Sequence, residues 1–482
     1  MGCASYLYLR CSSCEWTNEF YTSKLTNNFY EVNRRMVYAM RSIGCGRAGA
    51  KRFCGLMNMP PPPRPTPYAL HNKALLQSAK TVYAKTVVDA SKEIHDLKQT
   101  ASNEVVDCAV SCDGTWQRRG FSSLNGCVAT ISMDTGKILD VEPLSKVCHT
   151  CKKLNKKPQT SETASLKAEH EPKCKANYEG SAPAMEPEGA LRIFNRSVES
   201  NKLRYSEFYG DGDSKSYAAV KDVYEEDNVT VTKKECVGHV QKRVGTALRK
   251  LKKENKGLGR KGRLTDAMIE KLQNYYGIAI RTNCKDIESM KKAIYAALCH
   301  CASSGKDDYH IHCPDGKDSW CGFKRDKANA TKEYKHGAGL PKQVIGHVKP
   351  IFDRLSESSL LQRCLDGKTQ NQNESFNAMI WNRVPKEVFV GSDVFSLGVY
   401  DAAAHFNTGA SAAIELLKDM GLASGKFCSE ECLNSDKLRV RKGNYKCQDK
   451  NKKRRKVLRG EKKKKGDKLV AKEGETYASG AF

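Results

Sequence analysis

Three apolar segments separated by short turns impose the strongest constraint on how this chain can fold. They are VVDCAVSC (residues 105–112), NGCVATISMD (125–134) and KILDVEPLS (137–145), each rich in β-branched or small apolar residues. Such runs are typical of strands in a sheet interior. The dipeptide NG opens the second segment and DTG separates the second from the third, and both are turn signals. We therefore predict an antiparallel meander.

A carboxylate follows the first of these segments directly. Asp113 comes at the end of the apolar run, and Gly114 and Trp116 follow it. The ends of buried strands are where α/β folds hold metals and ligands. Asp113 is therefore the first candidate for chemistry, provided that other elements supply its partners.

Two later elements supply further acids. LRYSEFYGDGDS (203–214) predicts a strand that ends in aspartates, and NESFNAMIWNRV (373–384) predicts a helix that begins with a glutamate. Carboxylate oxygens are the ligands that Mg²⁺ prefers, and two such ions about 4 Å apart can drive phosphodiester chemistry. This order of elements is that of an α/β, RNase H-like core, a mixed sheet flanked by helices. Its candidate acids are Asp113, Asp211, Asp213 and Glu374.

The charge of the chain indicates a polyanionic partner. The formal net charge is +27 over 482 residues, and nucleic acid is the first choice for its partner. No stretch approaches the roughly 18 consecutive apolar residues of a membrane helix. Basic residues close to the acids and in a helical block fit contact with the DNA backbone better than base readout. We expect such contacts from Arg118, Arg119, Lys215, Lys242, Arg243, Arg249, Lys250, Lys252 and Lys253.

The 21 cysteines favour zinc sites over a disulfide framework, because the count is odd. Cys148 and Cys151 form a Cys-x-x-Cys pair, and His170 and Cys174 form a second close pair after a lysine-rich segment. Four such ligands make a tetrahedral zinc site, which we expect to be structural. His149 is an alternative ligand with poorer spacing.

Other cysteines and histidines leave more alternatives open. Cys236 and His239 are either half of a metal site or a buried polar pair, and Cys11 and Cys14 form half of a zinc knuckle. The segment CHCASSGKDDYHIHCPDGKDSWC (299–321) allows several tetrads. Its potential ligands are Cys299, His300, Cys301, His310, His312, Cys313 and Cys321. We choose the set His300, His312, Cys313 and Cys321.

The chain divides into six predicted parts. A Cys-containing helical region is followed by a Pro-rich linker and helix, the first part of the sheet core with the zinc loop 148–174, and a basic helical insertion with a Cys/His cluster. The rest of the core and a basic, disordered tail complete the chain. The corresponding ranges are 1–59, 60–100, 101–232, 233–345, 346–425 and 426–482.

Several longer motifs carry a resemblance. CDGTWQRRGFSSLNG, GSAPAMEPEGALRIFNRS, YGDGDSKSY, ECVGHVQKR, CPDGKDSWC and NQNESFNAMIW occur in this order, and together they resemble the Mutator-like transposase domain over most of residues 25–420. The resemblance implies a DDE transposase on an RNase H-like fold, with a helical insertion before the glutamate. By motif, Asp113 matches the first acid and Glu374 the third. Either Asp211 or Asp213 is the second, and we favour Asp211.

The resemblance also implies cofactors, partners and location. The catalytic ions would be Mg²⁺ or Mn²⁺, and the substrate double-stranded DNA at transposon ends and target sites; a homo-oligomer is left open. The basic run at 451–465 is typical of a nuclear import signal. One alternative is a domesticated, catalytically inactive nuclear DNA-binding zinc protein. A ribonuclease of the same fold is disfavoured, because it would not need the large basic insertion.

Overall fold

The computed structural model describes most of the chain. The described residues are 2–26, 28–118, 122–158, 160–210, 215–302, 307–330, 334, 339–455, 457–458 and 460–461. They divide into two units, residues 1–407 and 408–482. The first unit is a mixed α/β structure that contains a five-stranded sheet.

The sheet has the strand order β7-β6-β5-β8-β9. β5, β6 and β7 pair antiparallel, so the predicted meander is confirmed. β8 pairs parallel with β5, and β9 pairs parallel with β8. The strands are β5 (Val106–Trp116), β6 (Asn125–Ser132), β7 (Ile138–Ser145), β8 (Leu203–Gly210) and β9 (Thr232–Glu235).

β5 is longer than its apolar run. The apolar run ends at Cys112, but the strand continues through Asp113, which lies opposite Ala129 of β6. The antiparallel partner β6 continues to pair as far as Trp116, which keeps β5 extended. Pairing with β8 stops earlier, at Ser111 and Tyr209. Asp113 therefore lies beyond the point where the parallel neighbour ends.

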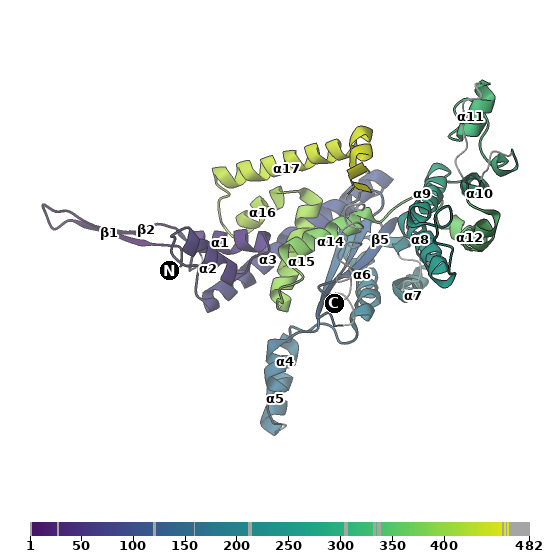
Figure 1. The fold of residues 1–482 in the computed structure, drawn as a ribbon. Helices are drawn as coiled ribbons and strands as arrows, with labels where there is room; N and C mark the ends of the chain where they lie inside the picture. Colours follow the sequence, from purple (N-terminus) through teal and green to yellow (C-terminus); the bar gives the residue numbers. More distant parts are fainter. Residues whose placement is uncertain are drawn as a thin grey trace. The chain divides into compact units, whose positions relative to one another are not determined.

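Helices cover both faces of the sheet (Figure 1). On one face α6 (Met185–Asn201) packs against alternate residues of β5, such as Val110 and Cys112. On the other, α14 (Asn371–Arg383) and α15 (Ser392–Thr408) pack against residues of β6 and β7. Successive strand side chains point to opposite faces, so Asp113, next to Cys112, points toward the α14 side.

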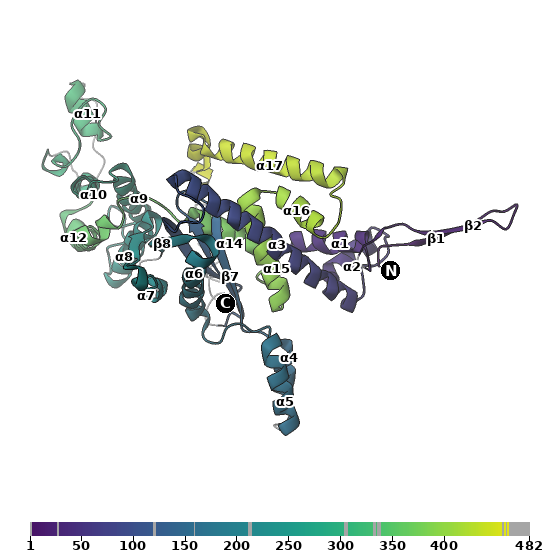
Figure 2. The ribbon, with the colours of Figure 1, turned by 180° about the vertical axis from the view of Figure 1, so that it is seen from behind.

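Between β9 and α14 the chain forms a helical block with a hydrophobic core of its own. This core runs from Val237 to Cys364 and so extends past residue 345, the predicted end of the insertion. The helices of the block are α8 (Val237–Glu254), α9 (Asp266–Thr282), α10 (Ile287–Ala302), α11 (Gly322–Asn329), α12 (Lys342–Leu355) and α13 (Ser358–Gln362). Figure 2 shows the labelled helices of this block, α8 to α12, on the side of the sheet where β8 lies.

Residues before the sheet form two hairpins and three helices. The run PPPPRPTP is predicted to be a linker, yet the last of its prolines lie in the first turn of α3. Proline is tolerated there because the first helical N–H groups have no helical partner. The elements are β1 (Tyr6–Arg10), β2 (Thr17–Tyr21), β3 (Leu25–Thr26), β4 (Phe29–Tyr30), α1 (Glu31–Ser42), α2 (Arg47–Leu56) and α3 (Pro65–Lys98).

The second unit contains α16 (Ser411–Asp419) and α17 (Lys426–Cys447). The sequence predicts disorder from residue 426 onward, and α17 corrects this for its own length. Only Cys432 of α17 is buried, and Asp436 of this helix accepts hydrogen bonds from the backbone N–H of Ala410, the residue before α16, at 3.0 and 3.1 Å. Residues 462–482 lie outside the described residues. Among the described helices, none has the length and apolar character needed to cross a membrane.

Candidate functional site

Polar side chains of α14 join β5 in register. Every fourth residue of the helix hydrogen-bonds the side chain of every second residue of the strand. The pairs are Asn373 with Ser111 at 2.7 Å, Asn377 with Asp113 at 2.9 Å, and Trp381 with Thr115 at 2.8 Å. Four helical residues rise about 6 Å and two strand residues about 6.6 Å. The match lets one helix face follow the strand.

This register decides where Glu374 lies. It follows Asn373 and precedes Asn377 by three residues, and positions three apart are neighbours on a helix surface. Glu374 therefore lies on the flank of the face that contacts Asp113. Its side chain is 61% exposed. Glu374 is thus a neighbour, on the surface of α14, of the residue that hydrogen-bonds Asp113.

Gln370 hydrogen-bonds both β5 and β8 at the point where the pairing of these two strands ends. Its Nε2 donates to the carbonyl oxygen of Cys112 at 3.2 Å and to that of Tyr209 at 3.0 Å. Its backbone N–H donates to Cys236 Sγ at 3.3 Å. The side chain is buried, and these bonds hold the ends of the two parallel strands beside the start of α14. Ligands of open α/β sheets bind at such a separation of strands.

The second predicted acid falls just beyond this point. β8 ends at Gly210, and Asp211 and Asp213 lie outside the described residues. The chain is described again from α7 (Lys215–Val220). Among the described residues, no group of three or more potential metal ligands includes Asp113 or Glu374.

A further carboxylate, that of Glu186 on α6, lies beside β5 on the face opposite to the Asp113 side chain. A Cβ added to Gly114 would come within 2.9 Å of Glu186 Cγ, so only glycine leaves room for this side chain. Glu186 also accepts a hydrogen bond from Ser216 Oγ at 3.0 Å. Burial raises the pKa of Cys112, and the charges of Glu186 and Asp113 raise it further. These two carboxylates therefore contribute negative charge near Cys112 from opposite faces of the strand.

The basic face of α8 begins beside Glu374. Lys242 Nζ lies 3.2 Å from Glu374 Oε1, and both side chains are exposed. Exposed basic residues then recur at helical spacing along α8, at Arg249, Lys250 and Lys253. The cationic side chains predicted to contact DNA therefore start at the candidate site and continue along one helix.

Besides Lys242, three predicted DNA contacts on α8 are engaged in ion pairs, among them the exposed Lys250 with Glu254 at 3.8 Å. Arg243 Nη2 lies 2.6 Å from Glu235, whose side chain is only 1% exposed, and Lys252 pairs with Asp266 at 3.0 Å. Burying Glu235 without a cation would be costly, so Arg243 has a structural partner that the basic run did not reveal. Arg118 and Lys215 are exposed, and Arg119 lies outside the described residues.

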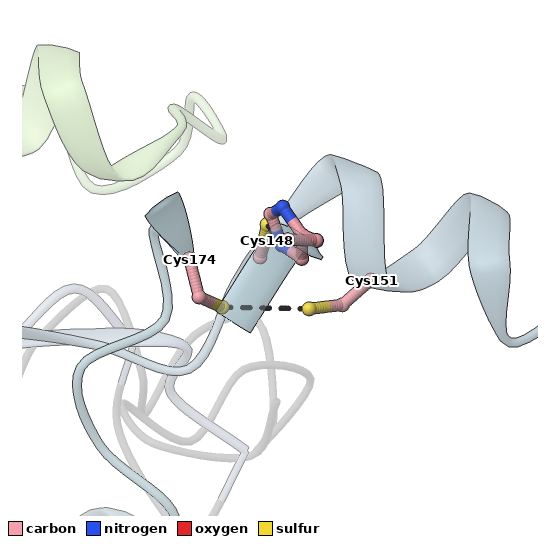
Figure 3. A group of neighbouring side chains, drawn as sticks. Cys148, Cys151 and Cys174 are labelled. Carbon is pink, nitrogen blue, oxygen red and sulfur yellow. Dashed lines mark hydrogen bonds between the residues drawn. The ribbon is translucent and has the colours of Figure 1, made fainter. Parts of the chain in front are cut away.

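The first predicted zinc ligand set comes together at the base of two short helices, α4 (His149–Leu154) and α5 (Ser161–His170). All four ligand atoms lie within 4.8 Å of one another. Cys148 Sγ is 3.1 Å from His170 Nε2, and Cys151 Sγ is 3.4 Å from Cys174 Sγ (Figure 3). Zn–S bonds of 2.3 Å place tetrahedral sulfurs about 3.8 Å apart. The cluster therefore has the dimensions of a zinc site.

Backbone groups prepare one of these thiols for metal. Although burial raises its pKa, the N–H groups of Cys151, Lys175 and Thr150 point at Cys148 and lower that pKa to about 6. A thiolate is the form that binds zinc. His149 is absent from the cluster, which agrees with its poorer spacing.

The second cluster differs from the chosen set in one ligand. His300, His310, Cys313 and Cys321 lie within 4.8 Å of one another. His310, at the end of η4 (Asp307–His310), is buried, whereas His312 is exposed. His310 Nδ1 is 3.3 Å from Cys321 Sγ. The choice of His312 therefore has to be corrected, because the turn after η4 carries His312 away from the sulfurs.

Cys236 and His239 form no such group with a third ligand among the described residues. Cys236 is the residue before α8, and its sulfur accepts the hydrogen bond from Gln370. Cys236 therefore joins the start of the helical block to the residue before α14.

Sequence reasoning missed Gln370, Asn373 and Asn377. A signal was present, because amide side chains recur at helical spacing around Glu374 in TQNQNESFN. Amides at positions three and four apart on a helix that also carries a candidate acid indicate a polar, buried face.

Comparison with known proteins gives one family. The sequence model of the Mutator-like transposase family matches residues 1–321, about two thirds of the chain. The matched range includes Asp113 and both Cys/His clusters and ends before Glu374. No curated protein matches the chain.

Proposed function

The chain belongs to the Mutator-like transposase family, and on this premise we propose that it is a DDE-type transposase. The reaction would be metal-dependent cleavage of DNA strands at transposon ends, followed by attack of the freed 3′-hydroxyl on target DNA. The observation that carries the proposal is the register of α14 on β5, which brings Glu374 to the flank of the face that binds Asp113.

The sheet supports an RNase H-like core for this reaction. An antiparallel meander of three strands is extended by two strands parallel to the first. Asp113 is on the first strand of the meander, and Asp211 follows the neighbouring strand β8 directly in sequence. We assign the second acid to Asp211, with Asp213 as the alternative.

The residues present fit a divalent cation, because carboxylate oxygens are hard ligands. Asp113 and Glu374, with Asp211, would hold Mg²⁺ or Mn²⁺. When bound, such ions activate the attacking oxygen and stabilise the leaving oxygen of a phosphodiester. Asn377 orients the Asp113 carboxylate, and Lys242 places a positive charge where the DNA backbone would meet Glu374.

Nicking of supercoiled plasmid tests the activity without knowledge of the transposon ends. The chain is expected to convert plasmid to nicked circles with Mn²⁺ or Mg²⁺ and not with Ca²⁺, which binds oxygen ligands in a more flexible geometry. An inactive, domesticated DNA-binding protein would bind the plasmid equally well and leave it supercoiled with every ion. That result would favour the alternative function.

The exposed basic face of α8 is expected to contact the DNA backbone. Each neutralised phosphate contributes roughly −0.9 to the slope of log affinity against log salt. Changing Arg249 and Lys250 together to Gln should therefore flatten the slope by up to about two. The matched control is Lys51→Gln with Arg52→Gln, an exposed basic pair on α2. Fluorescence anisotropy with duplex DNA, repeated over a range of salt concentrations, measures the slope for each double variant. Equal slopes for the two would show that Arg249 and Lys250 do not contact the DNA backbone.

We also propose a nuclear location, on the basis of the basic run at 451–465. Deleting residues 451–482 should move a fluorescently tagged chain from nucleus to cytoplasm. Retention in the nucleus would mean that another segment directs import.

A further inference from the structure

A cavity in the helical block is separate from the acids and from the basic face of α8. It has a volume of about 670 Å³ and lies between α9, α10 and the loop that carries the second Cys/His cluster. Volumes of this size are typical of small-ligand pockets. The cavity can therefore admit a flat ring system the size of a nucleobase.

The walls of this cavity are aromatic and apolar. The side chain of Trp320 lines it and leaves the residue 52% exposed, and Tyr275 lines it from α9. The floor is made of small residues of α9 and α10, among them Ala279, Ala296 and Ala297, which are buried. A large exposed indole beside a floor of alanines offers a surface for stacking a ring.

The rim of the cavity is polar, and its charge is positive. Thr282, Asn283 and Ser289 supply hydroxyl and amide groups, and Lys292 is the one fully charged residue among those that the structure places around the cavity. No carboxylate is among them. A flat ring with hydrogen-bonding edges and an attached anion matches this lining, which is the chemistry of a nucleotide.

The Cys/His cluster fixes the aromatic wall. Trp320 precedes the ligand Cys321, and its ring lies edge-on to that of His300, with centroids 5.1 Å apart. His312, which is not part of the cluster, lines the cavity from the same loop. A metal held by the cluster would therefore hold the loop, and with it the indole, against α10.

We propose that this cavity binds one unpaired nucleobase of DNA, stacked on Trp320 with its phosphate near Lys292. The inference rests on DNA as the ligand of the proposed function and adds to it a contact that needs the base outside the duplex. Extruding a base is cheapest where it is already unpaired. The chain should therefore prefer DNA that offers such a base.

Fluorescence anisotropy with two labelled duplexes tests the proposal, one fully paired and one with a single unpaired adenine. The wild-type chain should bind the second more tightly, and Trp320→Ala should lose about 5- to 150-fold in affinity for it, as base–aromatic stacking predicts. Affinity for the paired duplex should stay unchanged. Trp320→Phe should retain most of the preference. Trp16→Ala is the matched control, because Trp16 is 55% exposed and does not line the cavity.

Zinc content is measured in each variant, so that loss of the cluster is recognised. If Trp320→Ala loses zinc, Lys292→Gln replaces it as the test, because Lys292 is exposed and distinct from the cluster. That variant should also weaken the preference for the unpaired base. The proposal that the cavity binds a nucleobase would be wrong if the wild-type chain bound both duplexes with equal affinity. It would also be wrong if these variants kept the full preference for the duplex with the unpaired adenine. Neither result would affect plasmid nicking, which tests the proposed function.

Discussion

Asp113→Asn is expected to abolish metal-dependent nicking while leaving the affinity for duplex DNA nearly unchanged. The substitution removes the charge of a proposed metal ligand on β5 and keeps an oxygen that can accept the hydrogen bond from Asn377. The register of α14 on the strand should therefore survive, and with it the exposed basic face of α8. Nicking of supercoiled plasmid with Mn²⁺ and anisotropy with duplex DNA measure the two effects separately.

Asp107→Asn provides the control for this substitution. Asp107 is on the same strand, is exposed, and pairs with Arg204 at 2.6 Å. Exposed ion pairs contribute about 1 kcal/mol or less to stability, so the control should bind and cleave like the wild-type chain. Equal nicking by both variants would show that Asp113 is not the first acid.

Cys151→Ser is expected to lower bound zinc by one equivalent per chain and to unfold the segment around α4 and α5. These helices bury little, with only Leu154 and Thr163 buried in them. Among the described residues of this segment, no hydrophobic core could take the place of a bound metal, and structural zinc contributes roughly 10–16 kcal/mol of apparent binding free energy near pH 7. Metal analysis gives the zinc content, and amide hydrogen exchange of residues 148–174 reports the loss of structure.

Cys447→Ser is the matched control for this cluster, because Cys447 is an exposed cysteine at the end of α17. It should leave both zinc content and exchange unchanged. Slow exchange of α4 and α5 after Cys151→Ser, with no zinc lost, would mean that the four side chains are neighbours without a metal.

The sequence predicted the parts of the fold that depend on local pattern. Alternating and apolar runs located β5, β6 and β7, and Cys-x-x-Cys spacing identified Cys148 and Cys151 as partners of His170 and Cys174. These features are set by residues close together in the chain. The structure groups the same four ligands.

Features that depend on contacts between distant segments could not be predicted from local sequence pattern. β5 continues through Asp113 because β6 pairs with it there, and no local pattern encodes that partner. His310 rather than His312 joins the second cluster because His310, at the end of η4, is buried, whereas His312, two residues beyond that helix, is exposed. Arg243 belongs to a basic run, yet its partner is a buried glutamate on β9.

Binding of Mn²⁺ tests the central claim most directly, namely that Asp113 and Glu374 share a divalent-cation site. Electron paramagnetic resonance of the zinc-loaded chain, bound to duplex DNA and titrated with Mn²⁺, counts the bound ions. The account predicts a bound population in the wild-type chain that is retained in Asp107→Asn and lost in both Asp113→Asn and Glu374→Gln. Equal numbers and affinities of bound Mn²⁺ in all four proteins would contradict it.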